Sequence, residues 1–261
     1  MKVLTVCVVA ALALSATASA YAANSDSDKA VVIRDWTDTI SPAQQQAYEA
    51  GLMAFNQCLR EHHAKFSEPT VVHETGNDYQ YSTDVGPVTW ADMDLVGAEV
   101  DHCDATWRAQ VNPHLKGETS AFMVIQPDMS NLPANWKTQT PPPILHVTGY
   151  TLKPGHDASM AFTDAVKKIT AAAIKTKWPY YWSTLRIEGG GDGAPDYMLV
   201  IRSKNWADVG TDPNPALWKM VASAYGQSSA DAIRKSLNEA IAKAPDHFDK
   251  YNADLSYTAG K

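Results

Sequence analysis

The chain has 261 residues, of which 45% are hydrophobic and 20% are charged, an ordinary composition for a globular protein. Its formal net charge is −7, with 22 basic residues against 29 acidic ones and no run rich in lysine or arginine. Binding to nucleic acid or to an anionic membrane surface needs a basic patch, so we expect neither as a partner.

The first 22 residues have the pattern of a secretory signal peptide. Met1-Lys2 gives a short positive start and residues 3–13 are apolar. Either Ala18-Ser19-Ala20 or Ala20-Tyr21-Ala22 supplies the small-x-small pattern for cleavage. The apolar run is shorter than the ~20 residues that a bilayer-spanning helix needs. We therefore expect cleavage near Ala23, a periplasmic or secreted location, and no contact with the membrane after cleavage.

Residues 30–131 predict a first α+β unit. The expected elements are a strand at 31–36, a helix at 42–66, a hairpin of strands 70–75 and 79–85, a helix at 95–111 and a strand at 121–126. This β-α-β-β-α-β order is the split arrangement called ferredoxin-like.

A proline-rich linker is predicted at residues 132–143, where Pro133 and three consecutive prolines disfavour both helix and sheet. A second unit follows at 144–261. Its expected elements are a strand at 144–152, a helix at 157–175, a hairpin of strands 181–188 and 197–203, two helical runs around 217–225 and 233–241, and a strand at 248–257. Their order repeats that of the first unit.

Three short motifs occur twice in the same order, which predicts an internal duplication. They are Trp90–Met93 with Trp206–Val209, Pro127–Ser130 with Ala253–Ser256, and Ile40–Pro42 with Leu152–Pro154. A ferredoxin-like unit has both helices on one face of its sheet, so the other face is bare. We expect the two units to pack sheet to sheet and to cover these faces.

Two cysteines remain after removal of Cys7 with the signal peptide. Cys58 and Cys103 both lie on the apolar stripes of predicted helices, and an exported protein matures in an oxidising compartment. If the helices pack side by side, a Cα separation of about 5.5–6 Å allows a disulfide. We predict the Cys58–Cys103 disulfide; the alternative is a pair of reduced core cysteines.

The candidate ligand-binding residues lie on the predicted strands of the second unit. His146 and Tyr150 share one face of the strand at 144–152, and Arg186 and Tyr197 could point to the same side. Arg34 is the counterpart of His146 in the first unit. A histidine beside these groups could bind an anionic or phenolic ligand or act as a general base. The alternative is a hydrogen-bonded core histidine.

No metal site and no cofactor are expected from the sequence. The chain has no CxxC or HExxH motif, and His62 and His63 are adjacent on a helix, so their side chains diverge by about 100°. A phosphate-binding loop and a Gly-x-Ser-x-Gly motif are also missing from the sequence.

The turn Leu152–His156, the glycine-rich hairpin and the run Trp206–Asp208 resemble the dimeric α+β barrel superfamily. That superfamily includes antibiotic-biosynthesis monooxygenase-like, NIPSNAP-like and EthD-like proteins. The resemblance implies an intrachain pseudo-dimer of ferredoxin-like units. Haem-binding chlorite dismutase-like proteins share the tandem fold, but we match none of their residues here. Fold membership alone does not carry function.

Two classes of function remain. The sequence favours a non-catalytic protein that binds a small apolar or aromatic molecule or serves as a scaffold, because the catalytic constellation is sparse. The alternative is a cofactor-free monooxygenase-like or isomerase-like enzyme, with His146 as general base and Arg186 or Tyr197 stabilising an enolate. Oligomerisation through exposed strand edges is left open.

Overall fold

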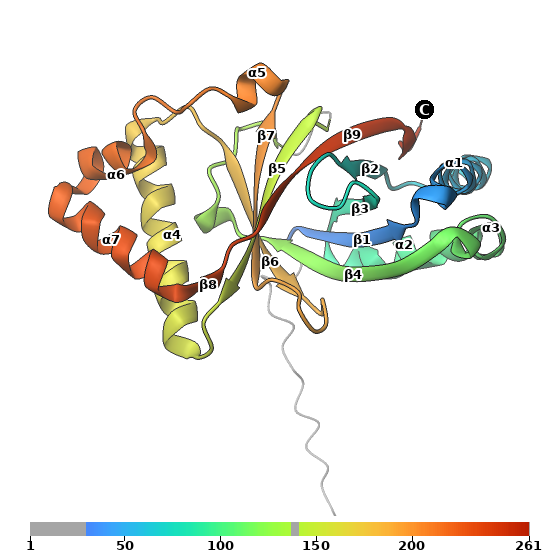
Figure 1. The fold of residues 1–261 in the computed structure, drawn as a ribbon, viewed down its shortest axis with the longest axis horizontal. Helices are drawn as coiled ribbons and strands as arrows, with labels where there is room; N and C mark the ends of the chain where they lie inside the picture. The colour runs from blue at the N-terminus through green and yellow to red at the C-terminus, as the bar shows by residue number, and fades with distance from the viewer. Residues whose placement is uncertain (1–29, 137–140, 261) are drawn as a thin grey trace, which may run out of the picture.

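The computed structural model describes residues 30–136 and 141–260 (Figure 1). The predicted signal peptide, residues 1–22, lies outside the described residues, so export stays an expectation. None of the described helices is long and apolar enough to cross a membrane.

The first half of the chain has the expected element order, with its second helix divided in two at His102–Cys103. Strand β4 begins six residues earlier than the sequence predicted. The elements are β1 (Val32–Ile40), α1 (Gln45–Glu61), β2 (Glu68–His73), β3 (Gln80–Val88), α2 (Met93–Asp101), α3 (Asp104–Gln110) and β4 (Leu115–Ile125).

The second half follows the predicted order closely. It adds a one-turn helix, α5, and a three-residue strand, β8, that the sequence did not reveal. The elements are β5 (Ile144–Leu152), α4 (His156–Thr176), β6 (Trp182–Glu188), β7 (Tyr197–Ser203), α5 (Trp206–Val209), α6 (Leu217–Tyr225), α7 (Gln227–Ala240), β8 (Ile241–Lys243) and β9 (Asp246–Tyr257).

Eight of these strands close into one antiparallel barrel in the order β7-β6-β4-β1-β3-β2-β9-β5, because β5 pairs back with β7. Within the first half the order is β4-β1-β3-β2, and within the second it is β9-β5-β7-β6. The pairs β2–β9 and β4–β6 join the halves by hydrogen bonds at both edges. The expected α+β class is confirmed. The barrel that the superfamily resemblance implies is also present, with the two sheets joined along both edges by hydrogen bonds.

The helices cover the outside of the barrel on two opposite sides (Figure 1). Helix α1 packs its apolar stripe of Tyr48, Leu52, Phe55 and Leu59 against the first half. Helix α4 does the same for the second half through its stripe around Phe162 and Ile169, together with α6 and α7. A separate apolar cluster that includes Met123, Ile125 and Leu185 comes from the alternate strand positions, which face the barrel interior.

The predicted disulfide is present. The Sγ atoms of Cys58 and Cys103 are bonded, and the Cα atoms are 5.9 Å apart. The bridge joins α1 to the junction between α2 and α3. It closes a loop with a sequence separation of 45 residues and holds the helical layer of the first half together.

The repeated motifs differ in how well their structures agree. Trp90–Asp92 and Trp206–Val209 both form a short helical turn directly after the third strand of their half. By contrast, Pro127–Met129 forms a 3-10 turn, while its expected counterpart at 253–256 lies within β9. Ile40–Pro42 and Leu152–Pro154 also agree, because Ile40 ends β1, Leu152 ends β5 and a helix follows each strand. Two of the three motif pairs are therefore equivalent in structure and the third is not.

Candidate functional site

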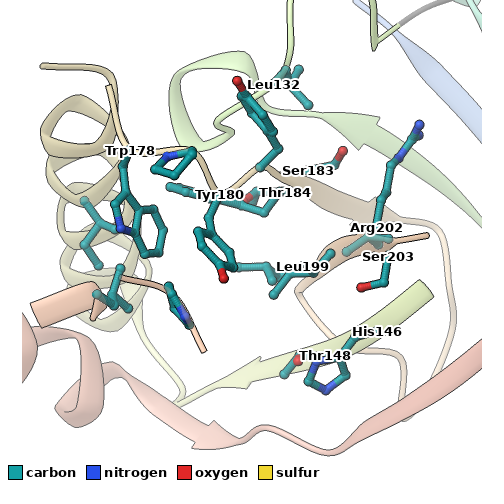
Figure 2. A pocket seen from close by; sticks show the side chains of 18 of the residues that line it. Leu132, His146, Thr148, Trp178, Tyr180, Ser183, Thr184, Leu199, Arg202 and Ser203 are labelled. Atoms are coloured by element: carbon teal, nitrogen blue, oxygen red, sulfur yellow. The ribbon is translucent and has the colours of Figure 1, made fainter. Parts of the chain in front are cut away.

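A cavity of about 870 Å³ is lined by β5, β6 and β7 and by the helices that cover their outer face. This volume is in the range of small-molecule sites. Ser183, Val200 and Arg202, at inward-facing positions of β6 and β7, also line the cavity. Figure 2 shows His146 and Thr148 together on one strand, with Trp178 across the cavity beside a helix. The lining is mostly aromatic and aliphatic and includes Trp136, Tyr150, Phe162, Val166, Ile169, Trp178, Tyr180, Trp182, Leu199, Ile201, Leu217 and Leu237.

His146 forms a pair with a carboxylate at the edge of this cavity. Its Nε2 lies 2.8 Å from Oδ2 of Asp246, the first residue of β9. The His146 ring stacks on Phe248, with ring centroids 4.4 Å apart, and Trp206 meets Phe248 edge-on at 5.6 Å. The side chain of His146 is 30% exposed and that of Asp246 is 60% exposed. The imidazole is thus held from two directions yet stays accessible.

This arrangement suits proton transfer. When the neutral ring donates its Nε2–H to Asp246, Nδ1 keeps a free lone pair that can accept a proton. The carboxylate then fixes the tautomer and stabilises the imidazolium that forms. The apolar lining around the pair would bind an apolar or aromatic molecule.

Tyr150 lines the same cavity. Its ring packs against Phe162 with centroids 5.4 Å apart. Burial raises the pKa of the Tyr150 phenol, and the nearby charge of Asp246 raises it further. Tyr150 therefore stays a neutral hydrogen-bond donor at physiological pH.

Arg186 and Tyr197 share the face of His146 but lie further along the strands. The register pairs Arg186 with Tyr197 and Tyr197 with Tyr150, four positions from His146, which corresponds to about 13 Å. Arg186 forms an ion pair with Glu188, and Tyr197 is buried against Phe162. Neither Arg186 nor Tyr197 is one of the described residues that line the cavity.

Arg34 lies in the other half of the barrel. It is the third residue of β1, as His146 is of β5. Its guanidinium packs over Phe122 at 4.4 Å and donates a hydrogen bond to Ser120 at 2.9 Å. Arg34 does not belong to the described lining of the cavity.

Asp246 and Phe248 were missed by sequence reasoning because they lie about a hundred residues from His146. The signal that could have found them is the ferredoxin-like strand order, which places the fourth strand of a unit beside the first. In the structure, His146 pairs with Phe248 and Thr148 with Asp246 across β5 and β9.

A second group of titratable residues was also missed and faces the barrel interior. Asp35 of β1 lies opposite Asp84 of β3. Burial raises the pKa of both carboxyl groups, and the proximity of Asp35 raises that of Asp84 further. Close carboxyl groups in such surroundings do not both ionise at neutral pH. The pair therefore retains a proton.

Comparison with protein-family models and with curated protein sequences finds no match to this chain. Solved structures match its fold. A Lactobacillus acidophilus protein, named provisionally as a monooxygenase, is 11% identical, with 88% of this chain and 97% of that one covered and a TM-score of 0.50. An anthrone oxidase-like protein is 11% identical, with coverages of 90% and 95% and a TM-score of 0.52. A provisionally named chlorite dismutase is 12% identical, with coverages of 86% and 96% and a TM-score of 0.50.

These neighbours correct the function favoured by the sequence. The sequence analysis preferred a non-catalytic binding or scaffold protein, but the matching structures are named as enzymes. That preference is therefore wrong, and the neighbours favour the enzyme alternative. At 11–12% identity the similarity itself establishes a shared fold. The chain has the barrel fold of proteins named as monooxygenases and chlorite dismutases.

Proposed function

We propose that this protein is an enzyme that removes a proton from a small apolar or aromatic substrate, with His146 as general base. The observation that carries the proposal is the 2.8 Å contact between His146 Nε2 and Asp246 Oδ2 at the wall of an aromatic cavity of about 870 Å³. A positioned base typically contributes ~10²- to 10⁴-fold to the rate.

The substrate class follows from the lining. Aromatic walls favour a flat, apolar molecule, and proton removal needs a phenolic group or a C–H group beside a carbonyl. Tyr150 lines the cavity four positions from His146, and its phenol stays protonated, so it can donate a hydrogen bond to a group of the substrate remote from the base. Arg186 and Tyr197 are not among the described lining residues, so neither is assigned the enolate-stabilising role that the sequence suggested.

Monooxygenase-like chemistry would consume molecular oxygen at this anion. Oxidation of a CH₂ group to a carbonyl by O₂ places one oxygen atom in the product and the other in water, and the substrate supplies all four electrons. No external reductant is then needed. In an isomerase-like reaction, by contrast, the proton returns to another carbon and no oxygen is consumed. An oxygen electrode separates the two reactions.

A haem enzyme is the principal alternative among oxidising proteins. His146 is the one histidine among the described lining residues, and its Nε2 is occupied by Asp246. The site therefore does not fit ligation of a haem iron through that atom. A Soret band in the purified protein that disappears in His146→Ala would contradict the proposal.

The experiment is a thermal-shift screen of phenolic and enolisable aromatic compounds, followed by turnover and oxygen-uptake assays on each compound that binds. We expect His146→Ala to lower kcat by ~10²-fold or more with little change in melting temperature. Asp246→Asn should give a smaller loss. His156→Ala, an exposed histidine at the start of α4, is the matched control. Full turnover by His146→Ala would refute the assignment of the base.

We also propose that the barrel is a tandem of ferredoxin-like units, residues 30–131 and 144–261, joined by the linker 132–143. The equivalent strand orders of the two halves support this arrangement. Separate expression of the two segments, followed by a test for their reassembly, would examine the boundaries.

Export to the periplasm or the medium is proposed from the signal-peptide pattern, and the Cys58–Cys103 disulfide is consistent with it. N-terminal sequencing of the protein recovered from cell fractions tests this proposal. A mature chain that begins near Ala23 and is found outside the cytoplasm is the expected result, and uncleaved cytoplasmic protein would contradict it.

A further inference from the structure

Three potential metal ligands meet on the inner face of the barrel, where β2 pairs with β9. His73 lies opposite Asp249 in the register of these strands. His247 precedes Asp249 by two residues on β9, so both point to the same side of the sheet. The strand pairing thus gathers two imidazoles and one carboxylate, although 174 residues separate His73 from His247 in the sequence.

The donor atoms are spaced as metal ligands are. Oδ1 of Asp249 lies 3.3 Å from His247 Nε2 and 3.6 Å from His73 Nε2. Bonds of about 2.0–2.2 Å at tetrahedral angles put neighbouring ligand atoms ~3.3–3.6 Å apart. All three donors lie within 4.8 Å of one another. The two imidazole rings are stacked, with centroids 4.3 Å apart, and His73 Nε2 also lies 3.5 Å from Ser82 Oγ.

The carboxylate of Asp249 has one oxygen that receives no hydrogen bond. It is only 3% exposed, and its Oδ1 accepts no hydrogen bond although it faces both imidazoles. A buried carboxylate oxygen without a donor is costly, by ~1–3 kcal/mol or more for a charged group. A bound cation would remove this cost, because it would take the lone pairs of Oδ1 and of both imidazole nitrogens.

The surroundings suit a cation that enters from solvent. The side chain of His247 is 26% exposed, whereas those of His73 and Asp249 are 9% and 5% exposed, so the site opens on one side. Asp35 and Asp84 lie close enough on the inner face to interact with Asp249, and Arg202 offsets part of their negative charge.

One other cluster in the described part of the chain has metal-ligand atoms this close, namely Cys58, His62 and Cys103. Its two sulfur atoms are joined in the disulfide, so neither is available as a thiolate ligand. That cluster is therefore not a metal site.

We propose that His73, His247 and Asp249 bind one divalent transition-metal ion of the Zn²⁺ type, with at least one coordination position open to water or substrate. Two imidazoles and one carboxylate are a ligand set that such ions accept, and three protein ligands with an open position are typical of reactive rather than structural sites. The sequence alone predicts no metal site, because no local motif joins these residues. None of the three lines the His146 cavity, so this site does not depend on the proposed function.

The test is zinc titration of tag-free, metal-stripped full-length protein by isothermal calorimetry, with Co²⁺ absorption spectra as a readout of coordination. We expect one Zn²⁺ per chain and visible Co²⁺ bands. His247→Ala and Asp249→Asn should each weaken binding by at least ~tenfold and alter the Co²⁺ bands.

His62→Ala is the matched control, since it removes an exposed imidazole and should leave zinc binding unchanged. Circular dichroism of each metal-free variant verifies folding, and Asp249→Asn, which keeps the side-chain shape, covers the case in which His247→Ala is unfolded. The proposal is overturned if the folded protein binds no zinc saturably, or if folded His247→Ala or Asp249→Asn binds it as tightly as the natural sequence does.

Discussion

Glu68 gives the sharpest prediction about stability. It begins β2 opposite Tyr257 and is only 4% exposed. Burial raises the pKa of its carboxyl group from the ordinary 4.5 to about 8. The folded protein therefore holds a proton at Glu68 over a pH range in which the unfolded chain has already lost it.

The sign and size of the effect follow from proton linkage. Between pH 4.5 and about 8 the folded state binds one proton more than the unfolded state, so the free energy of unfolding falls as pH rises, by ~1.4 kcal/mol per pH unit. The stabilising contribution is complete below pH 4.5. By pH 7 the loss amounts to ~3 kcal/mol, which is a large part of the stability of a typical domain.

Glu68→Gln removes this proton exchange while keeping the side-chain shape. Urea unfolding at pH 5, 6 and 7 should show that the variant gains ~2.5 kcal/mol relative to the natural sequence as pH rises from 5 to 7. Other buried carboxyl groups, such as Asp35 and Asp38, contribute equally to both proteins and cancel in this difference. Glu61→Gln, at the exposed end of α1, should show no such gain. Parallel pH profiles for Glu68→Gln and the natural sequence would refute the reasoning.

Two further predictions concern the helical layer of the first half. Replacing Cys58 and Cys103 by alanine should lower the free energy of unfolding by ~4 kcal/mol, which is the loop-closure value for a separation of 45 residues. The melting temperature should then fall by ~8–16 °C, and a fall of less than ~3 °C would contradict this prediction. Gly51→Ala should destabilise the protein by at least ~1–3 kcal/mol in urea unfolding, because the added Cβ would lie 2.0 Å from the carbonyl oxygen of Gln110. Gly97→Ala, which has open space around it, should stabilise the protein by ~0.5–1 kcal/mol. Equal effects of the two substitutions would refute the close approach of α1 and α3.

The elements with strong local signals could be predicted from the sequence. Strand β5 has the predicted bounds, 144–152, because β-branched and aromatic residues end at a Lys-Pro-Gly stop. Helix α4 differs by one residue at each end, because its apolar stripe is regular and it stops at Lys177 in the left-handed conformation. The disulfide followed from two apolar stripes that each carried a cysteine.

The elements without a local pattern could not be predicted. Residues 115–120 of β4 are mostly polar and exposed, so no alternation marks them as strand. They are strand because their backbone pairs with β1, as at Thr37 with Thr119 and Asp38 with Glu118. The division between α2 and α3 likewise has no sequence signal, since the apolar spacing continues through Cys103.

The candidate sites could be predicted only as far as single residues. The period-two alternation of side chains along a strand correctly placed His146 and Tyr150 on the same face of β5. The residues that they contact depend on which strands become neighbours. Asp246 reaches His146 because β9 pairs with β5, and Asp249 reaches His73 because β9 also pairs with β2. Strand order is a property of the whole barrel, and the residue pattern of a single strand does not contain it.

Strand β9 therefore supplies both sites from its two faces. Asp246 and Phe248 point outward to His146, while His247 and Asp249 point inward to His73. Since a shift of one residue would exchange the two faces, the pairings of β9 with β2 and β5 fix both arrangements at once. The outward pair meets an open aromatic cavity and suits proton transfer to an organic substrate. The inward pair lies among buried carboxyl groups, where a cation is stabilised and a neutral ligand is not.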